Sequence, residues 1–288
     1  MRVVLVLLAL AVVGCGGGGD ERARQQRAPA PAPEQAPPDP SRPLPRNARA
    51  LADDLAATTA SLKAGIDAWV GEGDPARGEP PADVTALAHR QQRIYVQLGK
   101  RPRLARRTIA ALPRELTAEA RDNVAARRAL SSIRSVVRFR PRIRIGPARP
   151  AGWLLQTYRR AQRRFRVGWP LLAAVNFVES AFGRMRNLSV SGARGPMQFM
   201  PATWEAYGLG GNVRDPHDAI MGAANYLRAS GAPGDESGAL YAYNPSPHYV
   251  RAISLYARRI RRDDRAFYAY YAWDVLVRGR RAKGRSSR

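Results

Sequence analysis

Residues 169–180 read Trp-Pro-Leu-Leu-Ala-Ala-Val-Asn-Phe-Val-Glu-Ser, and this stretch decides the fold of the chain around it. Pro170 suits the first turn of a helix. Leu172, Val175 and Glu179 then follow at i, i+3 and i+7, on one helical face. The carboxyl of Glu179 therefore lies at the end of an apolar stripe, where a core residue is expected. A buried carboxyl holds its proton more tightly, as a general acid at neutral pH must do.

Two other interpretations of Glu179 stay open from the sequence. Its side chain either reaches past the stripe into water or pairs with Arg184 or Arg186.

No Asp or Glu occurs between Ser180 and Trp204, so a second carboxylate is not close in sequence. The fold can still bring one of five later acids close to Glu179: Glu205, Asp215, Asp218, Asp235 and Glu236.

Further short motifs follow Glu179 in a fixed order. The three motifs are Glu179-Ser180, Gly195-Pro196-Met197-Gln198 and Ala242-Tyr243-Asn244. They resemble the Glu-Ser, Gly-Leu-Met-Gln and Ala-Tyr-Asn motifs of the soluble-lytic-transglycosylase catalytic domain, a lysozyme-like helical fold related to goose-type lysozyme. The resemblance covers roughly Trp153 to Arg261, well under half of the chain. Pro196 departs from the usual Leu and removes one backbone donor.

This resemblance implies an enzyme that cleaves peptidoglycan glycan strands. The expected target is the β-1,4 bond between N-acetylmuramic acid and N-acetylglucosamine, with formation of 1,6-anhydro ends. Glu179 is expected to act first as the acid and then as the base, so that no second carboxylate is needed. The alternatives are a hydrolytic muramidase on the same fold and a non-catalytic lipoprotein that binds the cell wall.

The resemblance also implies substrate-binding or supporting roles for six other residues: Ser189, Met197, Gln198, Phe199, Tyr243 and Asn244. We expect Tyr243 to hydrogen-bond Glu179, while Gln198 and Asn244 offer amides to the sugar. Met197 and Phe199 are either apolar walls of the site or plain core residues. Ser189 either supports the site or caps a turn. Three aromatic residues are expected either on sugar faces or in the core: Trp204, Tyr207 and Tyr249.

No cofactor is expected, and we also expect no metal. Some related enzymes carry a calcium loop after the Trp, at the place that Gly208 to Asp215 occupies here. This segment lacks the repeated carboxylates of such a loop. The three histidines show no metal-ligand spacing either.

The start of the chain predicts export. Arg2 precedes an apolar run from Val3 to Val13, which is shorter than the ~20 residues that cross a bilayer. A basic start, a short apolar run and small residues are typical of a secretory signal. Val12 to Cys15 resembles a lipobox, so residues 1–15 are expected to be a lipoprotein signal peptide with Cys15 as the lipidation site. The alternative is ordinary secretion to the cell wall with an incidental Cys.

The rest of the chain divides by composition into four segments. Residues 16–46 read as a Gly/Pro-rich disordered tether. Residues 47–145 read as a separate helical region of unknown role, residues 146–275 as the lysozyme-like catalytic domain, and residues 276–288 as a basic disordered tail. The predicted fold is all-α, and a basic connector is expected from Arg138 to Pro150. The predicted helices are Ala48–Val70, Asp83–Leu98, Thr117–Val136, Trp153–Phe165, Pro170–Phe182, Pro201–Tyr207, Pro216–Ser230, Ser237–Tyr243 and Ser246–Arg261.

The charge of the chain indicates polyanionic surroundings. Lys and Arg number 48 against 23 Asp and Glu, which gives a formal net charge of +25. Such a surplus attracts nucleic acid, anionic membrane or anionic cell-wall polymers. The predicted export and the lack of a nucleic-acid motif argue against nucleic acid. The expected partners are glycan strands of peptidoglycan, anionic wall polymers, and the membrane through a lipid anchor.

Overall fold

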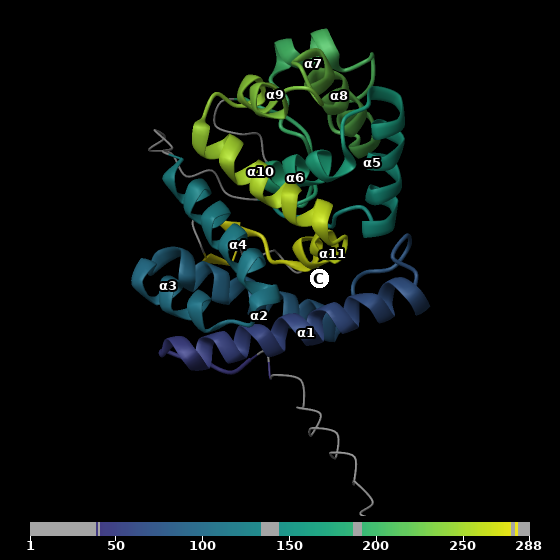
Figure 1. The fold of residues 1–288 in the computed structure, drawn as a ribbon. Helices are drawn as coiled ribbons and strands as arrows, with labels where there is room; N and C mark the ends of the chain where they lie inside the picture. The colour runs from purple at the N-terminus through teal and green to yellow at the C-terminus, as the bar shows by residue number, and fades with distance from the viewer. Residues whose placement is uncertain (1–38, 40, 134–143, 187–191, 278–279, 282–288) are drawn as a thin grey trace, which may run out of the picture. The chain divides into compact units, whose positions relative to one another are not determined.

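Eleven helices make up nearly all of the regular structure in the computed structural model, which describes residue 39 and residues 41–133, 144–186, 192–277 and 280–281 (Figure 1). The first four are α1 (Ala48–Glu72), α2 (Ala82–Lys100), α3 (Pro102–Ala111) and α4 (Arg114–Ser132). The other seven are α5 (Ala151–Phe165), α6 (Trp169–Ser180), α7 (Pro201–Tyr207), α8 (Pro216–Ala229), α9 (Glu236–Tyr243), α10 (Pro247–Arg262) and α11 (Arg265–Ala272). A two-residue antiparallel pair joins β1 (Leu276–Val277) and β2 (Arg280–Arg281). The described chain is therefore all-α, as predicted.

Helix α6 is buried on nearly every side. Five consecutive residues, Leu171 to Val175, have no solvent exposure. An α-helix that is apolar all round belongs inside a protein, and α6 is contacted by α5, α8, α10 and α11. The burial is thus wider than the single stripe that the spacing of Leu172 and Val175 predicted. Glu179 lies in the last turn of this central helix.

The N-terminal helices α1, α2 and α4 pack directly against helices of the later part of the chain. They share one hydrophobic core with the later helices. Helix α4 packs along α10, and both α1 and α2 contact α11. Trp69 of α1 packs edge-on against Tyr268, and Tyr95 of α2 lies 6.1 Å from Trp273 between ring centroids. An amphipathic pattern shows that a helix has a buried face but does not identify its partner, so the sequence left this packing open.

The end of the predicted tether is ordered against α2. Nη1 of Arg90 donates to the backbone carbonyls of Asp39 and Arg42, at 3.0 and 2.9 Å. Arg90 is only 4% exposed and also pairs with Asp54 at 2.6 Å. A buried guanidinium requires acceptors, and the chain before α1 supplies two of them. The disordered tether predicted up to residue 46 therefore does not include residues 39 and 41–46.

Several predictions fall on residues outside the described ranges. They include the signal peptide with Cys15, the tether up to residue 38, and the part of the connector that spans residues 138–143. The same holds for most of the predicted basic tail, although Leu276–Val277 and Arg280–Arg281 are described as the short β pair. Among the described residues, no helix combines the length and the apolar character needed to cross a membrane.

Each of the nine predicted helical segments overlaps a helix of the structure, but α3 and α11 were not predicted. Helix α3 follows α2 after the single residue Arg101, with Pro102 in its first turn. Helix α11 is only eight residues long. Short helices such as these give little periodicity in a sequence window.

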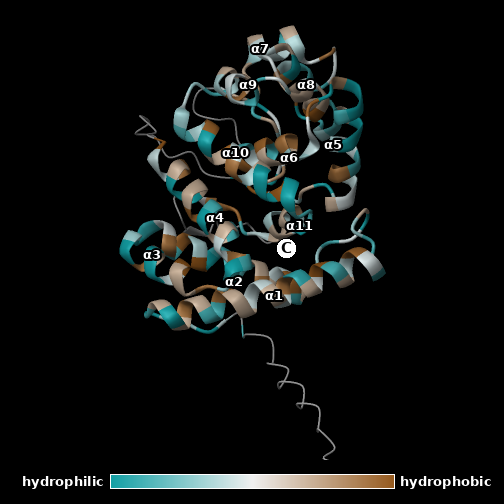
Figure 2. Ribbon diagram, in the orientation of Figure 1, coloured by the Kyte–Doolittle hydropathy of each residue, from teal (hydrophilic) through white to brown (hydrophobic). Residues whose placement is uncertain are grey.

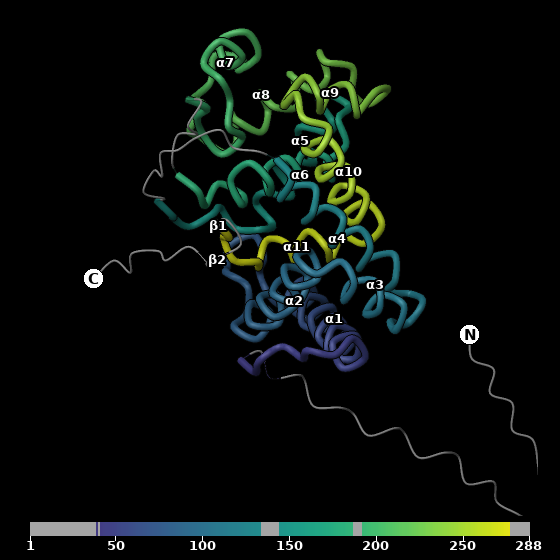
Figure 3. The backbone as a smooth tube through the Cα atoms, turned by 90° about the vertical axis from the view of Figure 1, so that its left-hand side faces the viewer, coloured from purple at the N-terminus to yellow at the C-terminus, as the bar shows by residue number. Residues whose placement is uncertain are grey.

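The two ends of the folded region carry different helices. Helices α7 and α9 lie at one end, and α1, α2 and α3 lie at the other, in both views of the chain (Figures 1 and 3). Helix α6 lies between them. In Figure 2, hydrophobic and hydrophilic residues are interspersed along α1 to α4, as expected for helices with one buried face.

Candidate active site

The centre of the candidate site is a hydrogen bond between Glu179 and Tyr249. The Tyr249 hydroxyl donates to Oε1 of Glu179 at 2.6 Å. Glu179 is half-buried, and burial raises the pKa of its carboxyl from 4.5 to about 7, while the bond from Tyr249 acts in the opposite direction. Burial also raises the pKa of Tyr249 well above its ordinary value, so its hydroxyl stays a donor. At neutral pH the carboxyl is therefore divided between its protonated and ionised forms.

Glu179 pairs with neither Arg184 nor Arg186 in the structure. Arg184 lies over the ring of Tyr271, at 4.3 Å from the centroid. Arg186 donates to the carbonyl of Pro147. Among the described residues no cation pairs with Glu179. The absence of a paired cation explains why burial dominates the pKa of this carboxyl.

The Gly-Pro-Met-Gln segment is fastened to helix α6 through one carbonyl. The backbone oxygen of Pro196 accepts from Nδ2 of Asn176 at 2.9 Å and from Oγ of Ser180. Asn176 in turn accepts from the Tyr158 hydroxyl at 2.8 Å. Pro lacks a backbone donor, but the group used here is its acceptor. The departure from the usual Leu at position 196 therefore leaves this connection intact.

The turn that contains this segment requires glycine at its first position. Gly195 has φ +75°, and a Cβ placed there would meet the Val213 carbonyl oxygen at 1.8 Å. Gln198 also has positive φ, at 51°, and its Nε2 donates to the Gly195 carbonyl at 2.8 Å. This bond fixes the amide of Gln198 and leaves its oxygen available as an acceptor. A non-glycine residue in the left-handed region stores strain, which is common near functional sites.

Tyr243 does not make the predicted bond to Glu179. Its hydroxyl donates instead to the backbone carbonyl of Met197 at 2.6 Å, which connects the end of α9 to the Gly-Pro-Met-Gln segment. The negative charge of Glu179 contributes to a raised pKa of Tyr243, after burial, so the two side chains lie within electrostatic reach. Asn244 follows Tyr243 as the residue that ends α9, and it is half-buried.

Met197 and Phe199 are core residues beneath the site. They are 0% and 3% exposed, so neither presents a free wall to a ligand. The ring of Phe199 contacts those of Trp204, Tyr226 and Tyr243 at centroid distances of 5.1 to 6.4 Å. Of the two interpretations that the sequence allowed, core packing agrees with the burial of both.

A row of half-buried tyrosines extends from the site. Tyr207, Tyr226 and Tyr243 are each partly exposed, and neighbouring rings lie 4.8 and 5.6 Å apart between centroids. Tyr226 is fixed by a bond from its hydroxyl to the Ala242 carbonyl at 2.9 Å. Aromatic faces of this kind pack well against the apolar faces of sugar rings. Ser189, the remaining predicted site residue, lies outside the described residues.

Of the five later acids that the fold was free to bring near Glu179, four form contacts elsewhere and the fifth is exposed. Asp215 and Asp235 cap the N-termini of α8 and α9. Asp218 accepts from the Asn212 backbone, and Glu236 pairs with Arg261 at 3.0 Å. Glu205 is exposed on α7. Burial and the Tyr249 hydrogen bond account for the pKa of Glu179, and no other carboxylate contributes to it within the described chain.

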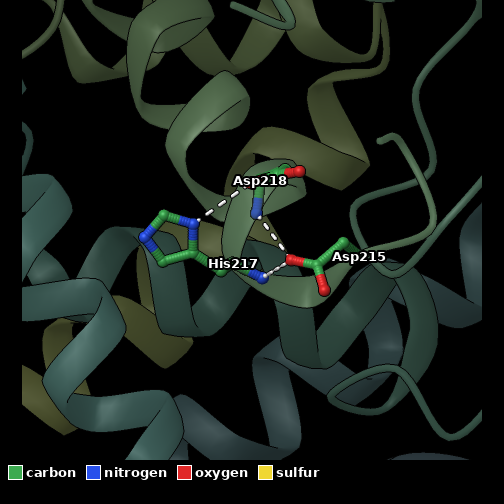
Figure 4. A group of neighbouring side chains, drawn as sticks. All are labelled: Asp215, His217 and Asp218. Carbon is green, nitrogen blue, oxygen red and sulfur yellow. Dashed lines mark hydrogen bonds and ion pairs between the residues drawn. The ribbon is translucent and has the colours of Figure 1, made fainter. Parts of the chain in front are cut away.

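Asp215, His217 and Asp218 form a cluster whose ligand-type atoms lie within 4.8 Å of one another (Figure 4). Oδ1 of Asp215 accepts the backbone N–H groups of His217 and Asp218, at 2.8 and 3.1 Å. Asp218 also lies 3.2 Å from Nδ1 of His217. The two bonds that Asp215 accepts are those of a helix N-cap.

Residues 156–261 match the family model described as the Transglycosylase SLT domain. The match identifies this part of the chain as an SLT-type domain with a lysozyme-like fold, and members of that family are typically lytic transglycosylases that act on peptidoglycan glycan strands. A domain with this substrate works outside the cytoplasm. Comparison with curated proteins and with solved structures gives no match.

Sequence reasoning missed the roles of Asn176, Tyr226 and Tyr249. Asn176 gave a usable signal, because it is the single amide in an otherwise apolar helical run and lies three residues before Glu179. Tyr249 was considered only as a sugar-stacking or core residue. It lies 70 residues from Glu179, and no local pattern predicts a contact over that separation.

Proposed function

We propose that this protein is a lytic transglycosylase that uses Glu179 as its sole acid and base. The observation that carries the proposal is a carboxyl with a pKa of about 7, without a paired cation and bonded by Tyr249. A general acid works best when its pKa lies near the working pH. The substrate would be the β-1,4 bond between N-acetylmuramic acid and N-acetylglucosamine.

In the first step the protonated Glu179 gives its proton to the glycosidic oxygen. The bond from this oxygen to the anomeric carbon of muramic acid then breaks, and the N-acetylglucosamine end leaves with a free hydroxyl. Oε1 of Glu179 already accepts the Tyr249 hydroxyl, so the other oxygen is the one available to carry the proton. The same hydrogen bond stabilises the carboxylate that the step leaves behind.

In the second step the carboxylate of Glu179 takes the proton of the 6-hydroxyl on the same muramic acid. The 6-oxygen bonds to the anomeric carbon, which gives a 1,6-anhydro end and returns Glu179 to its protonated form. No water is consumed, and the nucleophile is already attached to the reacting sugar, so little entropy is lost. One carboxylate thus does the work that most glycoside hydrolases divide between two.

The remaining residues bind and position the strand. Gln198 and Asn244 offer amide groups to sugar hydroxyls and N-acetyl groups. The row formed by Tyr207, Tyr226 and Tyr243 offers ring faces to successive sugars. Met197 and Phe199 support this surface from below, and Ser189 is assigned to the same site through the motif resemblance alone. We further propose that Cys15 is lipidated and anchors the protein to the bacterial cell membrane.

Product analysis tests the proposal against its two alternatives. Purified sacculi are digested with the wild type and with Glu179→Gln, and the fragments are identified by mass spectrometry. We expect fragments with 1,6-anhydro ends, which are lighter by one water, from the wild type alone. Reducing ends would indicate a hydrolytic muramidase. An absence of fragments, with binding to sacculi that is unchanged in Glu179→Gln, would indicate a non-catalytic binding protein.

A further inference from the structure

Helix α3 carries a stripe of arginines on its solvent face. Arg103, Arg106 and Arg107 are exposed and lie at i, i+3 and i+4, while Ala105 and Thr108 are buried on the opposite face. Six exposed cations make up what we call the α3 cationic surface: Lys100, Arg101, Arg103, Arg106, Arg107 and Arg114. Between residues 93 and 114 the sequence has no Asp or Glu, and Glu115 directly follows Arg114.

The six cations form no ion pair in the described part of the chain. Of the three acids of the neighbouring helix α4, Glu119 pairs with Lys63 and Asp122 pairs with Arg258. The third, Glu115, is exposed beside Arg114, so the α3 cationic surface keeps a large net positive charge. Charges of this kind attract anions over about a Debye length, ~8–10 Å at physiological salt.

Two apolar hollows flank this surface. The smaller, of about 280 Å³, is lined by Ile109, Ala110, Val124 and neighbouring alanines together with cations that include Arg106 and Arg121. The larger, of about 650 Å³, is lined by Lys100 and Arg101, by the acid Asp274 and by apolar side chains, among them Leu44, Val96 and Leu276. Hollows lined by both cations and apolar side chains fit a ligand with an anionic head and an apolar body.

The chain enters the fold at the same place. Ser41 and Leu44, which precede α1, line the larger hollow, and the Arg90 bonds hold the adjoining backbone. The 38 residues before this point begin with the apolar run Val3 to Val13. Helices α7 and α9, which bear on the candidate active site, lie at the opposite end of the fold (Figures 1 and 3).

We propose that the α3 cationic surface binds anionic phospholipid at a membrane face. Phosphate head groups would meet the arginine stripe, and the upper parts of the lipid chains or glycerol would meet the hollows. Such binding would direct the candidate active site away from the membrane and toward the wall. The inference does not depend on the catalytic proposal, because it rests on charge, hollows and the point of chain entry at the other end of the fold.

The test measures vesicle binding by the full chain and by matched triple variants. Phosphatidylcholine vesicles, without and with added phosphatidylglycerol, are used in co-sedimentation. The ratio of the two affinities removes the contribution of the apolar N-terminal run, which acts on both vesicles. Arg103, Arg106 and Arg107 are changed to Gln in one variant. Arg160, Arg163 and Arg164, which are exposed on α5, are changed to Gln in the other, so both lose three charges.

We expect the α3 variant to lose about 100-fold of its preference for anionic vesicles, because each cation near such a surface contributes roughly fivefold. The α5 variant should lose less than about threefold. Lysine at the three α3 positions should retain the preference, since the charge stays. Thermal unfolding of each variant checks the fold, and Glu179→Gln should bind like the wild type.

Four results would overturn the proposal. The first is a wild type without preference for anionic vesicles, and the second is an equal loss in the α3 and α5 variants, which would indicate diffuse attraction. The third is α3-dependent binding to soluble polyphosphate without binding to vesicles, which would assign the surface to an anionic polymer. A lysine variant that loses as much as the glutamine variant would contradict a role for charge.

Discussion

Helix α10 joins two regions that treat a carboxylate in opposite ways. Near its N-terminus, Tyr249 donates a neutral hydroxyl to Glu179, and burial raises the pKa of that acid to about 7. Near its C-terminus, Arg258 and Arg259 pair with two acids of α4. The chain has more than twice as many cations as acids, yet Glu179 has none beside it. The difference shows two uses of a buried acid. Glu179, without a cation beside it, retains its proton to higher pH, while the acids of α4 form ion pairs that connect helices.

The largest expected effect comes from removing the acid of the first region. Glu179→Gln keeps the shape and the acceptor for Tyr249 but has no proton to give, so activity should fall about 10²- to 10⁴-fold. The release of soluble fragments from purified peptidoglycan measures it. Glu205→Gln, at an exposed acid on α7, is the matched control and should retain wild-type activity. Equal losses of activity in both variants would show that Glu179 has no special role in the reaction.

Next in size is the loss of an acid in the second region. Glu119 is 9% exposed and lies 3.1 Å from Lys63 and 3.6 Å from Arg259. Glu119→Gln leaves the buried Arg259 without its counter-charge, which should lower the free energy of unfolding by about 3–5 kcal/mol. Urea denaturation measures this change.

The control for that experiment is Glu115→Gln, at an exposed position on the same helix. Its effect should stay within about 0.5 kcal/mol. If Glu119→Gln had wild-type stability, the ion pairs of Glu119 would not stabilise the fold, and the structural role given to the α4 acids would be contradicted.

A third prediction concerns stability at Glu179 itself. Its folded pKa lies above the unfolded value of 4.5, so the unfolded chain releases this proton first as pH rises. The wild type therefore loses stability between about pH 4.5 and pH 7, by about 3 kcal/mol at ~1.4 kcal/mol per pKa unit. Glu179→Gln escapes that loss and should be more stable than the wild type at pH 8, but equal to it at pH 4. Denaturation at both pH values measures the difference, and a constant difference would contradict the raised pKa.

The smallest expected effect comes from removing only the hydrogen bond. Tyr249→Phe takes away the group that lowers the pKa of Glu179, so that pKa should rise further. The falling limb of activity, near pH 7 in the wild type, should move to higher pH. Activity at its optimum should drop about tenfold, as expected for a lost bond to a charged group. Tyr256→Phe, two turns along the same helix, should leave the limb in place; a shift in both variants would mean that general loosening is the cause.

The sequence predicted the parts of this comparison that depend on local pattern. Nine helical segments and the placement of Glu179 at the end of a buried run follow from spacing and motif order. The sequence did not reveal that Tyr249 rather than Tyr243 bonds Glu179, because the choice depends on how α10 crosses α6. Tyr243 belongs to the Ala-Tyr-Asn motif, and Tyr249 follows that motif within a few residues. Only three-dimensional packing separates a hydroxyl that reaches the acid from one that reaches the Met197 carbonyl.

The packing of the N-terminal helices was unpredictable for a related reason. Amphipathic patterns predicted one buried face for each of α1, α2 and α4. They did not predict that the acids of α4 form ion pairs with Arg258 and Arg259. The ordered end of the tether depends on Arg90, a buried cation that recruits backbone carbonyls from a Pro-rich segment. Composition alone described that segment as disordered. Long-range pairing of charged groups carries no periodic signal, so it appears only in the folded structure.

The most direct test of the account is a titration of Glu179. The chain is labelled with ¹³C at the Glu side-chain carboxyl carbon, and the signal that is absent in Glu179→Gln is followed from pH 3 to pH 9. The account predicts a midpoint near 7 for this carboxyl. A midpoint near 4.5 for Glu179 would contradict it, because the carboxyl would then have no proton to donate at neutral pH.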